Sequence, residues 1–319
     1  MVPFVTIQFR VKGTLRPAVL SNKEMTKSRS QSNPLIFDPA EANVSPPGTA
    51  NGPILRAMTY NIHHGVGMDR RYDLNRIAEV IRNNNPDVVA LQEVERFRPR
   101  TKNDNQPSVL AKKLGMHYSF APVCNFSNID KSSRSRYGIA ILSRYPITSR
   151  EHFDISFGSA NEPRGVLHAR LNVNGIGLHV FCVHLGLRYR ERNYQIERLL
   201  SEEIINHARY NGGPKILLGD FNNWWPVKSA RYVHTHFHNA CVVTGQKRLR
   251  TFGKFFNYLC LDYIFTSRDV SIRSCDVIRD GEASRASDHR PVVCTLQLPD
   301  KKAATGAEKS QSISSQVSA

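Results

Sequence analysis

Seven polar or ionisable residues of this sequence lie within or at the ends of apolar segments. They are Asn61, Glu93, His184, Asp220, Asn222, Asp262 and His289. Burying one such group without a partner costs a few kcal/mol, and burying an ion costs more. One instance could be a structural contact, but a set of this size indicates that several strand ends converge on one polar site. Carboxylate and amide oxygens suit Mg²⁺ or Mn²⁺, and the absence of cysteine among them argues against structural zinc.

Apolar strands alternate with amphipathic helices along most of the chain. In the first unit, residues 54–62 and 87–94 have the composition of buried strands. Asp73 suits the N-cap of a helix between them, because its carboxylate can accept a backbone N–H. The apolar positions at helical spacing are Leu74, Ile77, Ala78 and Ile81. The second strand carries Glu93 near its end.

A later unit repeats this order. Its predicted helix has an apolar face made of Ile196, Leu199, Leu200 and Ile204. The strand that follows, KILLGDFNN, carries Asp220 and Asn222, which are two residues apart and would face the same way in an extended chain. Further strands are predicted at residues 137–147, 177–185 and 261–267. The alternation predicts an α/β fold.

Charge and composition limit the classes of protein to be considered. The net charge is +17, and most of it belongs to residues 53–298, where it would attract phosphates in nucleic acid, anionic lipid or phosphorylated metabolites. No apolar run reaches the ~18 residues of a membrane-spanning helix, and residues 1–52 show no secretory signal. We therefore expect a cytoplasmic monomer with buried, reduced thiols. Residues 1–52 and 299–319 are predicted to be a loosely ordered arm and a disordered tail.

Eight motifs resemble, in their order, the endonuclease/exonuclease/phosphatase superfamily of metal-dependent hydrolases. They are TYNIHHG, LQEVE, YGIAILSRYPI, EPRGVLHARL, VHLGL, GDFNN, LDYIF and SDHRPV. The resemblance spans residues 54–298 and is closest to the subgroup with TYNIHHG and HLGL. It implies a deoxyribonuclease-like four-layer α/β sandwich, with two packed mixed β-sheets and outer helices. The strand and helix alternation agrees with this fold.

The resemblance also implies a metal site at the end of the LQEVE strand. By position in the motifs, Glu93 is the principal metal carboxylate, Asn61 orients it and the metal shell, and Asp288 is a further metal or water ligand. The expected ion is Mg²⁺ or Mn²⁺. His63 and His64 stand where some relatives carry an aspartate that assists the metal. This departure leaves the number of metal ions open.

A catalytic set follows from the same match. Asp220 and Asn222 are implied to position the attacking water and bind phosphate oxygens, and Asp262 to fix the tautomer of His289. His184 is implied to be a second histidine on the phosphate side, where apurinic endonucleases carry tyrosine. For His184 a core histidine is the alternative, and Asp262 could be a simple buried hydrogen-bond acceptor.

Several cationic residues have two interpretations each. Arg164 in EPRG is either a bidentate phosphate ligand or a structural ion-pair partner. Arg188, Arg190 and Arg192, at the entry to a helix after VHLGL, either attract a polyanion or form a solvated helix face. Three histidines at alternating positions are expected at the surface rather than on a metal: His234, His236 and His238.

The sequence therefore predicts a metal-dependent phosphoesterase, most simply one that hydrolyses phosphodiesters with a water oriented by Asp220, Asn222 and His289. Nucleic acid and anionic phospholipid are both open as substrate. A phospholipid or inositol-phosphate hydrolase is the alternative within this chemistry, and a non-catalytic phosphate-binding module is the alternative outside it. We expect residues 96–136 and 241–260 to be the loops that select the substrate.

Overall fold

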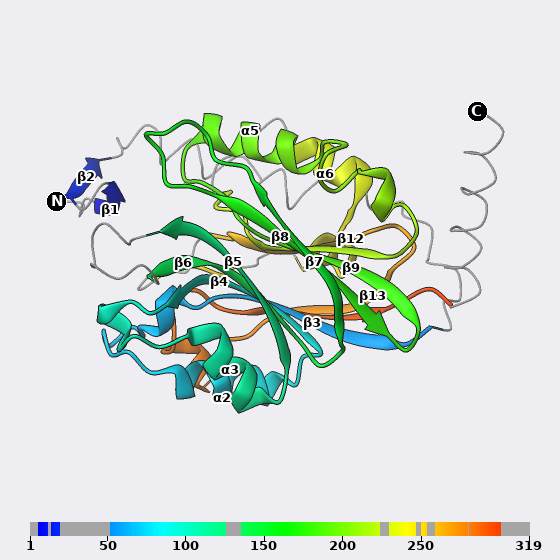
Figure 1. The fold of residues 1–319 in the computed structure, drawn as a ribbon, viewed down its shortest axis with the longest axis horizontal. Coiled ribbons are helices and arrows are strands. Elements are labelled where there is room, and N and C mark those ends of the chain that lie inside the picture. Colours follow the sequence, from blue (N-terminus) through cyan, green and yellow to red (C-terminus); the bar gives the residue numbers. More distant parts are fainter. Residues whose placement is uncertain are drawn as a thin grey trace.

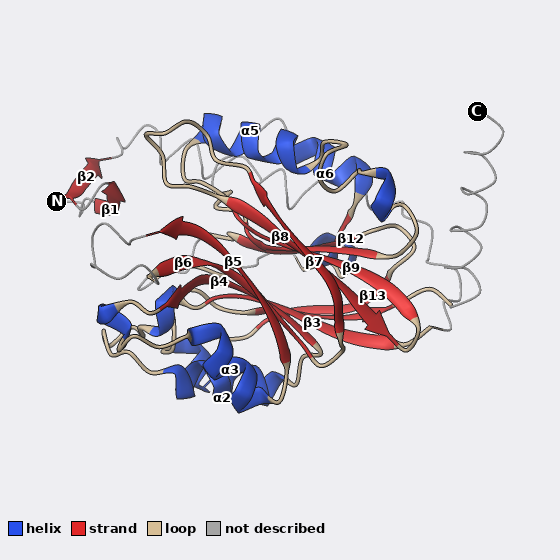
Figure 2. Cartoon of the chain, in the orientation of Figure 1, coloured by secondary structure: helices blue, strands red, loops and turns tan. Residues whose placement is uncertain are grey.

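A computed structural model gives the fold in four layers, with two β-sheets packed face to face and helices on the outer face of each (Figure 1). The structure describes residues 6–11, 14–19, 52–125, 135–223, 230–246, 250–253, 259–279 and 281–300. Figure 2 shows the longer helices outside the paired sheets. The predicted four-layer sandwich with two mixed sheets is confirmed.

The first sheet carries Asn61 and Glu93 on its two central strands. Its strand order is β13-β14-β3-β4-β6-β5. The central pair β3 and β4 is parallel, and the other pairs are antiparallel. The strands are β3 (Ile54–Asn61), β4 (Val88–Arg96), β5 (His117–Asn125), β6 (Arg136–Ser143), β13 (Ser271–Val277) and β14 (Val292–Gln297).

The second sheet carries His184, Asp220 and Asp262 and is built in the same way. Its order is β11-β12-β10-β9-β8-β7, with a parallel pair, β9 and β10, inside antiparallel neighbours. The strands are β7 (Ile147–Asp154), β8 (Gly165–Val173), β9 (Ile176–His184), β10 (Lys215–Asp220), β11 (His238–Asn239) and β12 (Asp262–Thr266).

Helices α2 (Leu74–Asn84) and α3 (Gln106–Leu114) cover the first sheet, and α5 (Tyr189–Leu199) and α6 (Ala230–His236) lie outside the second (Figure 1). The shorter helices are η2 (His63–Gly65), η3 (Pro99–Thr101), η4 (Ala208–Tyr210), α7 (Ala240–Val243) and η5 (Gly281–Ser284). No helix in the described part of the chain combines the length and the apolar character needed to cross a bilayer.

Alternating residues of β4 explain how the layers hold together. Val88 and Ala90 are buried between the two sheets, whereas Val89 and Leu91 are buried against the face that α2 covers. Because both faces of this strand are buried, its sequence is a continuous apolar run rather than an alternating one. Burying each large aliphatic side chain of this kind contributes about 1.5–3 kcal/mol.

The predicted helix after β3 is confirmed at both ends. Oδ1 of Asp73 accepts the backbone N–H of Asn75 at 2.8 Å, which makes Asp73 the N-cap. The helix ends before Asn85, which has a left-handed φ of 48° and closes the last turn. The predicted strands at residues 54–62, 87–94, 177–185 and 261–267 also form, within one or two residues of their expected ends.

Two expectations about the elements are wrong in detail. Helix α5 ends at Leu199, because the hydroxyl of Ser201 donates to Arg198 O at 2.8 Å and the chain turns, so Ile204 is buried but outside the helix. Residues 137–147 are not one strand, since the chain leaves the first sheet after β6 and enters the second at β7. Pro146 stands at this crossing, where it has no N–H to add to a ladder.

The segment expected to be a substrate loop, 96–136, is largely structured. It contains α3 and β5, and Leu110 and Ala111 of α3 pack into the core. Parts of both expected loops lie outside the described residues, as do most of the predicted N-terminal arm and the tail beyond residue 300. Strands β1 (Thr6–Val11) and β2 (Thr14–Val19) pair antiparallel within that arm. The domain boundaries remain predictions.

Candidate active site

The ends of the central strands of the two sheets meet, and Asn61 joins them. Asn61 is the last residue of β3, and its Nδ2 donates to Oδ2 of Asp220 at 3.0 Å and to Oε1 of Glu93 at 3.1 Å. Its Oδ1 accepts the backbone N–H of His63 at 3.0 Å. Asn61 is 1 % exposed. Its amide therefore bonds to both carboxylates, and its predicted role toward a metal stays a prediction.

Strand register brings three site residues side by side in the second sheet. Asp220 is paired with His184 on β9 and with Asp262 on β12. The close approach of β9 needs Gly219, because a Cβ there would lie 2.1 Å from the carbonyl oxygen of Val183. His184, Asp220 and Asp262 are all buried. The sheet thus holds a carboxylate between an imidazole and a second carboxylate.

His289 completes this group from the segment before β14. Its Nδ1 lies 2.9 Å from Oδ2 of Asp262, and its Nε2 lies 3.7 Å from Oδ2 of Asp220. Because a carboxylate only accepts, Nδ1 carries the proton in this pair. Burial opposes the charged imidazole, yet the carboxylates of Asp262 and Asp220 outweigh it and raise the pKa of His289 to about 10. His289 is therefore an imidazolium at neutral pH.

Asp220 is shifted toward its protonated form. Burial is the main cause of its raised pKa, and the charge of Asp262 adds to it, while His289 acts in the opposite direction. The backbone N–H of Asn222 donates to Oδ1 of Asp220 at 2.8 Å, which leaves Oδ2 facing the two histidines. A carboxylate with its pKa raised in this way is a proton acceptor suited to neutral pH.

His184 faces Asp220 from the other side and, unlike His289, is neutral. Its Nε2 lies 3.6 Å from Oδ2 of Asp220, and its Nδ1 lies 3.2 Å from Nη1 of Arg164. Since arginine has no acceptor, Nδ1 must accept and the ring proton is on Nε2. Burial, reinforced by the charge of Arg164, holds the pKa of His184 well below its usual range. His184 is thus a neutral donor beside Asp220.

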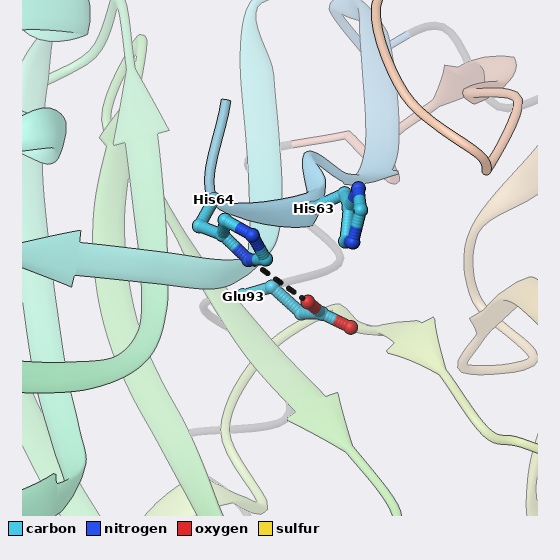
Figure 3. A group of neighbouring side chains, drawn as sticks. All are labelled: His63, His64 and Glu93. Carbon is cyan, nitrogen blue, oxygen red and sulfur yellow. Dashed lines mark ion pairs between the residues drawn. The ribbon is translucent and has the colours of Figure 1, made fainter. Parts of the chain in front are cut away.

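A β-bulge turns Glu93 out of its strand toward the site. The register of β4 against β6 shifts between Leu91 and Val94, and Glu93 has a left-handed φ of 57°. Such a bulge re-aims a side chain without ending the strand. Burial alone would raise the pKa of Glu93, but the neighbouring imidazole of His64 is the main group that outweighs it and holds this pKa well below its usual range. Figure 3 shows the Glu93 carboxylate near His64.

Asn222 reaches the site by a different route from the one predicted. Strand β10 ends at Asp220, and Asn222 has a left-handed φ of 48°, so the two residues do not face the same way along an extended chain. That expectation is wrong because the backbone turns directly after the strand. The side-chain amide of Asn222 donates to Leu185 O at 2.8 Å, which ties the turn to the end of β9.

Asp288 lies at the edge of the site. It is half-buried, and its Oδ1 lies 4.0 Å from Nδ1 of His63. The neighbouring Ser287 hydroxyl donates to Asn61 O at 2.8 Å, which attaches this segment to the end of β3. The described polar contacts of the Asp288 side chain are therefore with His63 and Ser287 rather than with Glu93.

Comparison with known proteins agrees with this geometry. Residues 58–289 match the sequence model of the endonuclease/exonuclease/phosphatase family. The chain belongs to this family. Members of the family, as its name states, are endonucleases, exonucleases and phosphatases, which hydrolyse phosphate esters. The resemblance on which the site residues were predicted is thereby confirmed at the level of the family.

Individual relatives give the same result. The chain is 31% identical over 259 residues to the protein YbhP of Escherichia coli strain K12, which covers 76% of this chain and 96% of that protein. An endonuclease/exonuclease/phosphatase from Beutenbergia cavernae superposes with a TM-score of 0.62 at 23% identity, over 77% of this chain and 72% of that one. The mannosyl-6-phosphatase Bt3783 of Bacteroides thetaiotaomicron superposes with a TM-score of 0.55 at 19% identity, over 76% and 99%. At these identities the two structures show a shared fold.

Two contacts in the candidate active site were not predicted from the sequence. The ring of Phe252 lies against His289, with centroids 4.8 Å apart and the ring planes tilted by 55°. The hydroxyl of Thr251 accepts the backbone N–H groups of Leu261 and Asp262 at 2.9 and 3.2 Å. The local sequence RTFG gives no signal of either contact, because both depend on the pairing of distant segments.

The three arginines at the start of α5 differ in their exposure to solvent. Arg188 and Arg190 are exposed at the start of α5, but Arg192 is 1 % exposed and donates to Leu187 O at 2.6 Å. Neither interpretation of the three arginines, attraction of a polyanion or a solvated helix face, fits Arg192, because it is buried. Its position on the helix turns it under the preceding loop.

The alternating histidines lie at the end of α6 and in β11. His236 is exposed, whereas His234 and His238 are half-buried. Among the described residues, the groups able to hold a metal are two others: His63, His64 and Glu93, and Asp220, Asp262 and His289. In the second group Nδ1 of His289 is already bonded to Asp262.

Proposed function

We propose that the chain is a metal-dependent phosphoesterase that hydrolyses phosphodiester bonds. One arrangement carries the proposal: Oδ2 of Asp220 lies 3.6 and 3.7 Å from Nε2 of His184 and of His289. A proton acceptor, a neutral donor and an imidazolium thus surround one point, next to the carboxylate of Glu93. This combination suits phosphodiester hydrolysis, because the acceptor can take a proton from water and the donors can stabilise the negative charge that the transition state gathers on the phosphate oxygens.

The chain offers a donor set that fits a divalent cation. Glu93 is held in its anionic form, and Asn61 orients its carboxylate at 3.1 Å. We propose Glu93, Asn61 and Asp288 as the residues that hold Mg²⁺ or Mn²⁺, both of which favour oxygen ligands. When bound, such an ion neutralises charge on the phosphate oxygens as a Lewis acid.

The protein groups have distinct proposed roles. Asp220 orients the attacking water and accepts its proton, and the turn at Asn222 holds the carboxylate in place. His289, kept charged by Asp262, stabilises the negative charge that develops on the phosphate. His184 donates from Nε2 to a phosphate oxygen. Arg164 positions His184; its predicted contact with phosphate remains a proposal, because Nη1 also pairs with Glu162 at 3.1 Å.

The experiment is a panel of phosphate esters assayed with Mg²⁺, Mn²⁺ and excess chelator. Single- and double-stranded nucleic acid, phospholipid, inositol phosphates and a simple phosphomonoester would be compared. We expect cleavage of a diester that chelator abolishes, and loss of most activity in Glu93→Gln. Full hydrolysis in chelator would exclude the metal assignment, preference for the monoester would make the enzyme a phosphatase, and no hydrolysis of any ester would favour the phosphate-binding module.

A phospholipid substrate is the second candidate, and one surface favours it. Leu187, Tyr189 and Tyr194 are 37 %, 39 % and 38 % exposed, and they lie with Arg188 and Arg190 on the loop and helix that follow His184. Apolar and cationic side chains together suit an anionic bilayer surface. Sedimentation with phosphatidylserine vesicles, compared with neutral vesicles, would test it. Binding to neither kind of vesicle would remove this candidate.

A further inference from the structure

Two adjacent histidines lie beside Glu93, on the loop that follows β3. His63 and His64 form η2 directly after the Asn61 and Ile62 pair, and each offers a ring nitrogen within 4.8 Å of the other's and of a Glu93 oxygen. Figure 3 shows the carboxylate below and between the two rings. His63, His64 and Glu93 all have left-handed φ angles, of 45°, 45° and 57°. Backbone held in this region by non-glycine residues is concentrated at functional sites.

The contact of His63 with the Val66 carbonyl leaves one of its ring nitrogens available to bind a metal. Its Nδ1 lies 3.0 Å from the carbonyl oxygen of Val66, so Nδ1 must donate. In the neutral ring this leaves a lone pair on Nε2. Histidines that bind metals in proteins show the same pattern, with the second nitrogen donating to a carbonyl or carboxylate that fixes the ring.

His64 has a ring nitrogen that nothing in the described structure satisfies. Its Nδ1 is buried, makes no hydrogen bond, and lies 3.6 Å from Oε2 of Glu93. Leaving a buried polar group unpaired is unfavourable, because the group loses its hydration without gaining a hydrogen bond. The turn that places it is anchored, because Nε2 of Gln106 donates to His64 O at 2.8 Å. A cation held by both His64 and Glu93 would satisfy this nitrogen and neutralise the carboxylate.

We propose that His63, His64 and Glu93 form a mixed nitrogen–oxygen site that binds a first-row transition-metal ion in preference to Mg²⁺. The proposal rests on the proposed function in one respect, since Glu93 is also the residue assigned to the catalytic metal. Imidazole suits ions such as Fe²⁺, Ni²⁺ and Zn²⁺ best. Mn²⁺ favours oxygen, but it accepts imidazole more readily than Mg²⁺, which gains little from nitrogen. The two histidines would therefore decide which ion the Glu93 site takes.

The alternative is that His64 is only an ion-pair partner of Glu93. Measurements of metal affinity distinguish this ion pair from a metal site. Mn²⁺ and Mg²⁺ affinities of the full chain would be measured by calorimetry for wild type, His63→Ala and His64→Ala. We expect each variant to lose about 10–100-fold in Mn²⁺ affinity, with the Mg²⁺ affinity changed less than about 3-fold. His117→Ala, an exposed histidine on β5, is the matched control and should change neither.

Pulsed electron paramagnetic resonance of the wild type with Mn²⁺ provides a readout that needs no variant. Coupling to imidazole ¹⁴N is expected in wild type and should be weaker in each histidine variant. Absence of nitrogen coupling, or equal losses of Mn²⁺ and Mg²⁺ affinity in the variants, would overturn the proposal. Nitrogen coupling in a chain that hydrolyses no ester would support this site and remove the proposed function. Hydrolysis of an ester by a chain whose bound Mn²⁺ shows no nitrogen coupling would support the proposed function and overturn this site.

Discussion

Nη1 of Arg164 lies 3.2 Å from Nδ1 of His184, and this contact fixes the tautomer of the histidine. The guanidinium can only donate, so the imidazole must keep its proton on Nε2, which faces Asp220. Both side chains are buried, at 6 % and 5 % exposure, so water does not compete for the contact. Arg164 therefore acts on the site through His184.

Removing this contact should change both the tautomer and the rate. We expect Arg164→Met to lower kcat about 10–100-fold, less than the 10²–10⁴-fold for loss of an acid–base group, because His184 itself remains. The ¹⁵N chemical shifts of His184 should then report a mixture of tautomers. Glu162→Gln is the control, because Glu162 pairs with Arg164 but does not contact His184. An unchanged His184 spectrum in Arg164→Met would contradict the assigned role.

The Asp262 and His289 pair should behave as one unit. His289→Ala is expected to lower kcat about 10²–10⁴-fold, as for loss of a general acid–base or charge-stabilising group. Asp262→Asn should lower it less, because the imidazole remains but loses the carboxylate that keeps it charged. The double variant should be far less impaired than the product of the two losses. Losses that multiply in full would show that the residues act independently.

The salt dependence of kcat/KM should identify the residues that guide the substrate. Arg188 and Arg190 are exposed beside the site, so Arg188→Gln with Arg190→Gln should flatten the fall of kcat/KM with added salt and leave kcat nearly unchanged. Arg192 is excluded from this test because it is buried. A double variant with the same salt slope as wild type would show that these arginines do not attract the substrate.

A buried histidine pair outside the site should make stability fall in mild acid. His168 Nε2 lies 2.9 Å from His179 Nδ1, and burial lowers the pKa of His168 to about 4 and that of His179 to about 3. Between those values and ~6.5 the unfolded chain binds more protons than the native one, so stability decreases as pH falls. Each imidazole that stays neutral should cost about 1–2 kcal/mol between pH 7 and 5.

Urea unfolding of wild type and of His168→Gln with His179→Gln, at pH 7 and pH 5, measures this loss. The double variant should be less stable at pH 7 but should change less between the two pH values. His117→Gln, at an exposed position, should keep the wild-type difference. A double variant with the full wild-type pH difference would assign the acid sensitivity to other groups.

The sequence by itself determined the family, the alternation of strands and helices, and which residues to propose for the candidate site. These features depend on residues close together in the sequence or on the order of motifs along it. The Asp73 cap acts over two residues, and motifs such as GDFNN and SDHRPV keep their order along the chain. The family pattern also supplied the pairing of Asp262 with His289, which the structure shows at 2.9 Å.

Only the tertiary structure decided how these groups face one another. Asn61 and Asp220 are 159 residues apart, and their contact exists because two sheets pack with their strand ends together. The bulge at Glu93, the left-handed turn at Asn222 and the burial of Arg192 depend in the same way on neighbouring strands and loops. The periodicity of apolar residues shows which face of an element will be buried. It does not identify the element against which that face will pack.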